Sequence, residues 1–142
     1  MFETSSKFYK NTGSFMANCV LYQTLSTGYL YRAYSQIANP SNGQKAGLAF
    51  TILTMLSLWF FMQFRFQAKD GKKKVRTEAI IVMVSFLFGI IQNGLLTEYY
   101  YRQLQATAPW KYASFHFIFL WLQTVFQILA LVFYFIALKN SS

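Results

Sequence analysis

The sequence predicts an all-α integral membrane helix bundle, and three observations lead to that fold class. Hydrophobic residues make up 55% of the 142 residues and charged residues only 12%, which is about half the charged share of a typical soluble domain. Aromatic residues reach 20%, more than so small a core can enclose, so most should face lipid or neighbouring proteins. Three long segments contain no Asp, Glu, Lys or Arg, as transmembrane helices do.

The three uncharged segments are Ala46 to Phe64, Ala79 to Thr97 and Ala113 to Leu138. At 1.5 Å per residue, the first two would extend about 28 Å and the last about 39 Å, against a hydrocarbon core of about 30 Å. Each segment is therefore long enough to span a bilayer as a helix. The last one should tilt or protrude.

A fourth segment, Gly13 to Tyr34, is uncharged until Arg32 but is more polar than the others. Its polar residues include Asn18, Gln23, Thr24, Ser26 and Thr27. These groups would bond to other helices if the segment crosses the membrane, or would face water if it lies in the interface as an amphipathic helix. The length and the terminal tyrosines favour a crossing, which gives four spans; the interfacial alternative gives three.

The distribution of basic residues also favours four spans. Six of them lie between Arg65 and Arg76. With four spans, both termini share the side of this segment, and nine basic residues face four; with three spans, seven face six. The larger bias agrees with the rule that basic residues gather on the cytosolic or matrix side. Met1 to Gly13 contains no apolar core, so we expect insertion without a cleavable signal.

The uncharged segment Ala79 to Thr97, the third of the four predicted spans, should belong to a helix that extends beyond the membrane. Thr77 is its expected N-cap, and Glu78 would face the positive end of the helix dipole. Glu98 and Arg102 stand four residues apart in the order that favours a helical pair. The sequence therefore predicts a helix from about Glu78 to Ala106.

Few residues are available for enzyme chemistry. Cys19 is the single cysteine, which excludes an intramolecular disulfide and every zinc site built on paired cysteines. His116 is the single histidine, and the whole chain has four carboxylates, too few for most catalytic metal sites. The sequence therefore predicts a protein that is not an enzyme and has no metal or cofactor.

One polar stripe tests this prediction. His116, Gln123, Gln127 and Tyr134 recur at spacings of seven, four and seven, which places them on one helix face. His116 would then be a candidate axial ligand to haem or chlorophyll, or a member of a proton relay. Alternatively, the stripe binds neighbouring helices and His116 lies at the headgroup level. The lack of a second ligand favours the alternative.

Small residues form a second pattern, typical of close helix packing. Ser85, Gly89 and Asn93 recur every four residues, and Gly43 and Gly47 form a GxxxG motif. With the glutamine stripe, the predicted packing interface is Gly43, Gly47, Ser85, Gly89, Asn93, Gln123 and Gln127. We expect Gly89 in particular to contact another subunit. A substrate path lined by Gln92 and Asn93 is the alternative, but the uncharged segments lack the charge that transporters use for coupling.

A basic cluster, Lys72, Lys73, Lys74 and Arg76, is the predicted lipid-binding site. Each basic residue near an anionic surface contributes about 1 kcal/mol, which suits an anionic phospholipid such as cardiolipin. The alternative is that the cluster determines topology alone. Nucleic-acid binding is not predicted, because no helix, sheet or aromatic platform accompanies the cluster.

These features predict a single transmembrane domain over residues 1–142 that acts as a non-catalytic accessory subunit of a larger membrane complex. The first expected location is a respiratory-chain or ATP synthase assembly of the mitochondrial inner membrane, with other membrane subunits and anionic phospholipid as partners. The endoplasmic reticulum is the second. The alternative function is a small lipid-modifying enzyme or transporter of the endoplasmic reticulum that uses His116 and the face of Gln123 and Gln127.

Overall fold

The computed structural model describes residues 7–69, 71–101 and 113–139. All regular structure within these residues is helical, which confirms the predicted all-α fold class. The elements are α1 (Lys7–Ser35), α2 (Asn42–Gln67), α3 (Lys72–Leu96), the π-helical turn η1 (Thr97–Tyr101) and α5 (Ala113–Lys139). Four long helices therefore match the four predicted segments, with η1 continuing α3.

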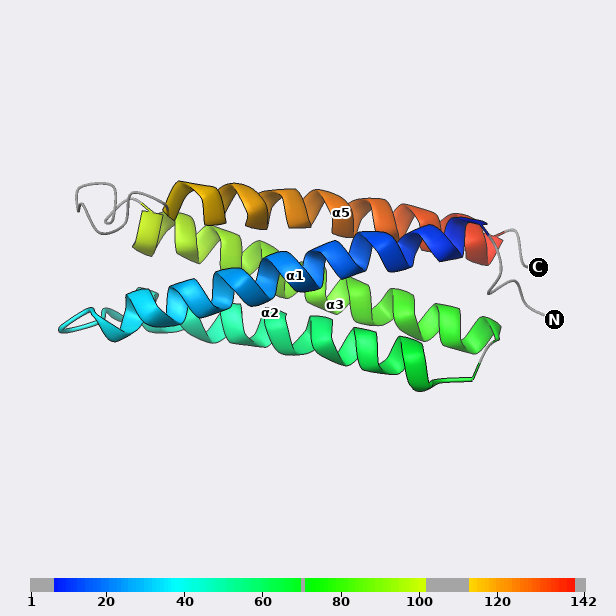
Figure 1. Cartoon of the computed structure of the whole chain (residues 1–142), viewed down its shortest axis with the longest axis horizontal. Coiled ribbons are helices and arrows are strands. Elements are labelled where there is room, and N and C mark those ends of the chain that lie inside the picture. The colour runs from blue at the N-terminus through cyan, green and yellow to red at the C-terminus, as the bar shows by residue number, and fades with distance from the viewer. Residues whose placement is uncertain (1–6, 70, 102–112, 140–142) are drawn as a thin grey trace.

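The helices form an up-and-down bundle. Each helix packs against the next one in the chain, and α1 closes the bundle by packing against α5. Figure 1 shows that the start of α1, the turn between α2 and α3 and the end of α5 lie at the same end of the bundle. Side chains that are far apart in the sequence therefore lie at the same height along the bundle axis and contact one another.

Three stretches of the described residues are long and apolar enough to cross a membrane. They are Asn42–Gln67, Lys72–Tyr100 and His116–Lys139, with mean hydropathies of 1.6, 2.1 and 2.0. α1 is not among them, although its 29 residues extend about 43 Å at 1.5 Å per residue. Its polar side chains lower its hydropathy, and those of Thr12, Gln23, Ser26 and Thr27 are buried in the bundle. Burial of these groups favours a crossing over an interfacial position, where they would face water.

α2 and α3 begin with different kinds of cap. α2 begins with a capping box, in which the Ser41 side chain accepts from the Gln44 amide and the Gln44 side chain accepts from the Ser41 amide. The predicted N-cap at Thr77 is wrong, because α3 begins at Lys72 with Gly71 as its N-cap. Gly71 has a φ of 153°, a conformation that glycine adopts at little cost. The lysines after it are good helix formers, so the helix begins earlier.

The predicted end of this helix near Ala106, with Arg102, lies outside the described residues. Helical structure is described through Tyr101.

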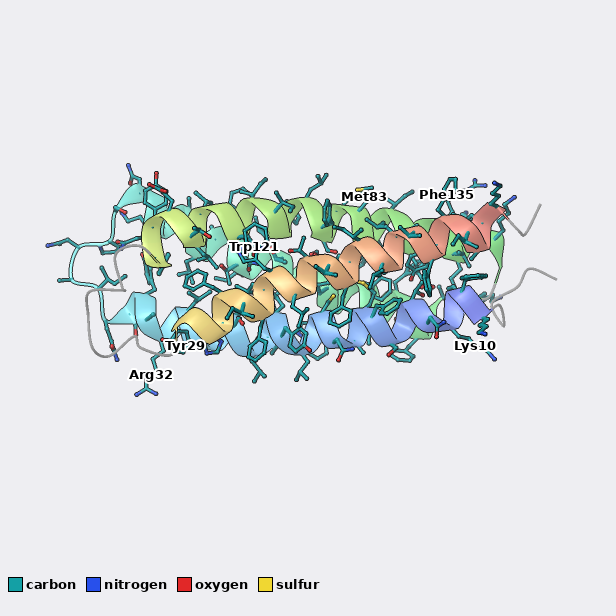
Figure 2. The ribbon with its side chains drawn as sticks, turned by 90° about the horizontal axis from the view of Figure 1, so that it is seen from above. Lys10, Tyr29, Arg32, Met83, Trp121 and Phe135 are labelled. Atoms are coloured by element: carbon teal, nitrogen blue, oxygen red, sulfur yellow. The ribbon has the colours of Figure 1, made fainter. Side chains whose placement is uncertain are left out.

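The outer surface of the bundle is largely apolar, and its interior contains polar side chains as well as apolar ones. One apolar cluster includes Met16, Leu58, Val82 and Ala130, and a second one includes Leu96 and Leu120. Large apolar side chains also cover the outer surface; Met83 points away from the bundle in Figure 2 and is 44% exposed. This distribution is what lipid or a neighbouring membrane protein around the bundle would require.

A labelling experiment tests whether α1 crosses the membrane. Lys10 near the start of α1, Lys72 at the start of α3 and Gln36 just after the end of α1 are exposed. The starts of α1 and α3 lie at one end of the bundle, and the end of α1 lies at the other. In a Cys19→Ala background, cysteines at positions 10 and 72 should react with a membrane-impermeant maleimide from the same side, and a cysteine at position 36 from the opposite side. Labelling of positions 10 and 72 from opposite sides would mean that α1 does not cross.

Candidate functional site: polar clusters inside the bundle

A carboxylate cluster joins all four helices at the end of the bundle that contains the α2 to α3 turn. Glu78 of α3 is fully buried. The Tyr9 hydroxyl of α1 donates to its Oε2 at 2.6 Å, and the Tyr134 hydroxyl of α5 donates to its Oε1 at 2.7 Å. Arg65 of α2 completes the cluster with Nη1 3.2 Å from Oε1. Both carboxylate oxygens are therefore hydrogen-bonded, as a buried charge requires.

Arg65 is held on its other sides by α1. Its Nη1 donates to Thr12 Oγ1 at 2.7 Å, and its Nη2 donates to the Tyr9 carbonyl oxygen at 3.1 Å. The guanidinium carbon also lies 4.2 Å from the centre of the Tyr9 ring, within the range of a cation–π interaction. Gly13 makes room for it, because a Cβ there would lie 3.0 Å from Nη2. The ion pair thus connects α1, α2 and α3.

A glutamine cluster occupies a second level, about 21 Å further along α3. Gln23 of α1 is its centre: Nε2 donates to Gln92 Oε1 at 2.6 Å and to the Thr51 carbonyl oxygen of α2 at 3.1 Å. Gln123 of α5 donates from Nε2 to Gln23 Oε1 at 3.0 Å. One side chain of α1 therefore bonds to all three of the other helices.

The glutamine cluster continues as a directional chain of hydrogen bonds. Gln92 Nε2 donates to Asn93 Oδ1 at 3.3 Å, and Asn93 Nδ2 donates to Thr124 Oγ1 at 2.9 Å. Thr124 follows Gln123 in α5, so the chain begins and ends on one helix after passing through α1 and α3. All of these amide side chains are buried in the bundle.

The predicted stripe on α5 does not form one site. Gln123 belongs to the glutamine cluster, Gln127 donates to Ser85 Oγ at 3.0 Å, and Tyr134 belongs to the carboxylate cluster. His116 lies near the other end, with Nδ1 3.4 Å from Ser26 Oγ and its ring stacked on Tyr29 at 4.1 Å between centroids. Within the described residues, no group of three His, Cys, Asp or Glu could hold a metal ion.

The GxxxG motif of α2 packs against tyrosine rings from η1. The Tyr99 ring covers Gly43, so that a Cβ at Gly43 would overlap the ring, and a Cβ at Gly47 would lie 3.1 Å from the Tyr100 ring. The Tyr100 hydroxyl also donates to the Gln44 carbonyl oxygen at 2.8 Å. The two glycines thus make space for side chains rather than for a facing backbone.

Gly89 also lies inside this chain rather than on its surface. A Cβ built on it would be 3.5 Å from Gln127 Oε1 and 3.9 Å from Thr54 Cγ2, so it faces α5 and α2. The expectation that Gly89 contacts another subunit was wrong, because the face that it shares with Ser85 and Asn93 is buried within the bundle.

Substitutions at Gly89 should therefore change the stability of this chain. Gly89→Ala should be neutral or raise the free energy of unfolding by up to about 1 kcal/mol, since the methyl group fits and alanine favours helix. Gly89→Leu should lower it by about 1 to 3 kcal/mol through overpacking. Thermal unfolding in detergent measures both. Gly94, which is exposed on α3 with open space around it, is the control; an equal loss from Gly94→Leu would contradict the internal contact.

The predicted lipid-binding residues divide into two groups. Lys72, Lys73 and Arg76 are exposed, whereas Lys74 is 9% exposed. The four residues of the predicted cluster are therefore not equally accessible. Lys69, which was not among the predicted residues, is exposed on the other side of the turn.

Comparisons with protein-family models, with curated proteins and with solved structures gave no match. The class that the fold and its polar clusters define is an all-helical bundle with three helices suited to a membrane and a hydrogen-bonded polar interior.

Proposed function

We propose that this protein is a non-catalytic structural subunit of a larger membrane complex. The observation that carries the proposal is that polar side chains from all four helices form hydrogen bonds with one another in the carboxylate and glutamine clusters. Such bonds hold helices together in a bilayer. Gln23, Gln92 and Glu78 have their hydrogen-bond partners within the bundle, as do the amide nitrogens of Gln123 and Gln127. The Oε1 atoms of Gln123 and Gln127 are buried with no partner among the described residues.

The outer surface supports the same proposal. Large apolar side chains on α2, α3 and α5 are exposed along the bundle, among them Leu56, Phe60, Ile80, Leu87, Val125 and Phe135. Acyl chains and the helices of other membrane subunits are the surroundings that cover such a surface. The role is then to pack between subunits and lipid rather than to convert a substrate.

For the location, we propose the mitochondrial inner membrane, in a respiratory-chain or ATP synthase assembly. The supporting observations are the small size and the net charge of +9, since basic residues at a membrane surface favour anionic lipids such as cardiolipin. The endoplasmic reticulum remains the second location.

Purification from native membranes in a mild detergent tests the role and the location together. A tagged chain should migrate on a native gel with an assembly far larger than 16.5 kDa, and mass spectrometry should identify inner-membrane subunits as the co-purifying proteins. A chain that migrates alone and carries lipid-modifying or transport activity would overturn the proposal and favour the alternative based on His116, Gln123 and Gln127.

A further inference from the structure

Three adjoining hollows lie along α2 as far as the turn before α3, and each shares two lining residues with the next. The first hollow has a volume of about 570 Å³ and is lined by Leu56, Trp59, Phe60, Met62, Gln63 and Phe66. The second hollow shares Phe60 and Gln63 with the first and reaches Ala68. The third hollow shares Phe64 and Ala68 with the second and opens between Lys69, Lys73, Lys74 and Thr77. We call these three hollows the α2 groove.

The α2 groove changes character along its length. Aromatic and aliphatic side chains line the part next to the middle of the bundle, and two exposed lysines, Lys69 and Lys73, flank its other end. Between Arg65 and Arg76 the sequence has six basic residues and one acidic residue, Asp70. Glu78, the next carboxylate, is buried against Arg65. An anion is therefore the complementary group for the basic end.

The start of α3 adds to this complementarity. Gly71 is the N-cap residue and has no side chain to accept hydrogen bonds from the first-turn amides. The N-terminal end of a helix also carries a partial positive charge. Lys73 lies in this first turn, so a phosphate there would meet an ammonium group and the helix dipole together.

The length of the groove matches the depth of one lipid leaflet. From Ala68 back to Leu56 the helix rises about 18 Å at 1.5 Å per residue. Half of a hydrocarbon core of about 30 Å is about 15 Å. An acyl chain attached to a headgroup at Lys69 and Lys73 would therefore lie along Phe64 and Phe60 and end near the bilayer midplane.

We propose that the α2 groove binds one anionic phospholipid, with its phosphate between Lys69 and Lys73 and an acyl chain along Phe64 and Phe60. This proposal rests on the proposed function only in placing the chain in a bilayer. It differs from the sequence prediction in that Lys69 takes part, whereas Lys72 and Arg76 do not line the groove.

Native mass spectrometry of the purified full-length chain tests the headgroup contact. The chain is reconstituted in nanodiscs of phosphatidylcholine with added phosphatidylglycerol, and the lipid that stays bound after release is quantified. Lys69→Gln with Lys73→Gln should weaken phosphatidylglycerol binding about 25-fold, at about fivefold for each lysine. Retention of phosphatidylcholine should not change.

The matched control is Lys72→Gln with Arg76→Gln, which removes the same charge from the same end of the bundle without touching the groove. This pair should change phosphatidylglycerol binding less than threefold, roughly the effect of diffuse attraction between exposed charges. Equal losses in the two double variants would overturn the proposal, because the attraction would then have no specific site.

A second pair of variants tests the acyl contact. Phe60→Ala should reduce phosphatidylglycerol retention severalfold, and Phe135→Ala should not, because Phe135 is similarly exposed but lies on α5. Equal retention in these variants, or displacement of the lipid by inorganic phosphate alone, would also overturn the proposal. All of these measurements use the isolated chain, so failure to find a partner complex would affect only the proposed function.

Discussion

Arg65→Met should lower the free energy of unfolding by about 3 to 5 kcal/mol, the largest effect that we expect from a single substitution. The change leaves the carboxylate of Glu78, which is fully buried, without its cation. It also removes the donors to Thr12 and to the Tyr9 carbonyl oxygen. The loss should be visible as a lower unfolding midpoint in a titration with SDS or in a thermal scan in detergent.

Two further variants show whether this loss comes from the ion pair. Arg76→Met removes an exposed arginine from the same end of the bundle and should change the free energy of unfolding by less than about 0.5 kcal/mol. Arg65→Met combined with Glu78→Met should recover much of the loss, because replacing both partners leaves no uncompensated buried charge. If Arg65→Met costs no more than Arg76→Met, the carboxylate cluster does not hold the helices together.

Gln23→Leu should lower the free energy of unfolding by about 2 to 4 kcal/mol. Gln23 makes four hydrogen bonds to Thr27, Thr51, Gln92 and Gln123. The lower limit of about 2 kcal/mol corresponds to four hydrogen bonds at about 0.6 kcal/mol each, a typical value between membrane helices. The upper limit of about 4 kcal/mol adds the penalty for leaving the amides of Gln92 and Gln123 buried without this partner.

The same unfolding titration measures this effect, with Gln63→Leu as the control. Gln63 is an exposed glutamine on the outer face of α2, so its replacement should leave the unfolding midpoint unchanged or raise it slightly in detergent. Equal midpoints for Gln23→Leu and the wild-type chain would show that the glutamine cluster contributes nothing to stability.

The helices were predictable because a long segment without charged residues has few structures open to it other than a membrane-spanning helix. Which face of each helix is buried in the bundle was only partly predictable. Ser85, Gly89 and Asn93 were expected to face helices, and the same face reaches Glu78 seven residues before Ser85. That spacing is the signal in the sequence for a buried carboxylate. The basic residues just before Glu78 favour the other interpretation, in which Glu78 begins the helix outside the membrane.

α1 illustrates a second limit of sequence-based prediction. Its buried residues recur at alternating spacings of three and four, from Tyr9 through Thr12, Met16, Cys19, Gln23 and Ser26 to Leu30. The regularity places the polar groups on one face. The partners of each amide, however, depend on how far α1 lies along α3 and α5, which local sequence does not determine. The function is harder still to predict, because a buried glutamine can either join helices or bind a ligand, and the residue type does not distinguish the two roles.

The two polar clusters together determine how the helices align. Tyr9 and Gln23 are 14 positions apart on α1, and their partners Glu78 and Gln92 are also 14 positions apart on α3. Because α1 and α3 run in the same direction, one alignment of the two helices satisfies both hydrogen bonds. One residue inserted between Tyr9 and Gln23 would rotate one of these side chains by about 100° around the helix axis relative to the other. The spacing inside these helices is therefore fixed much more strictly than the identity of the apolar residues outside them.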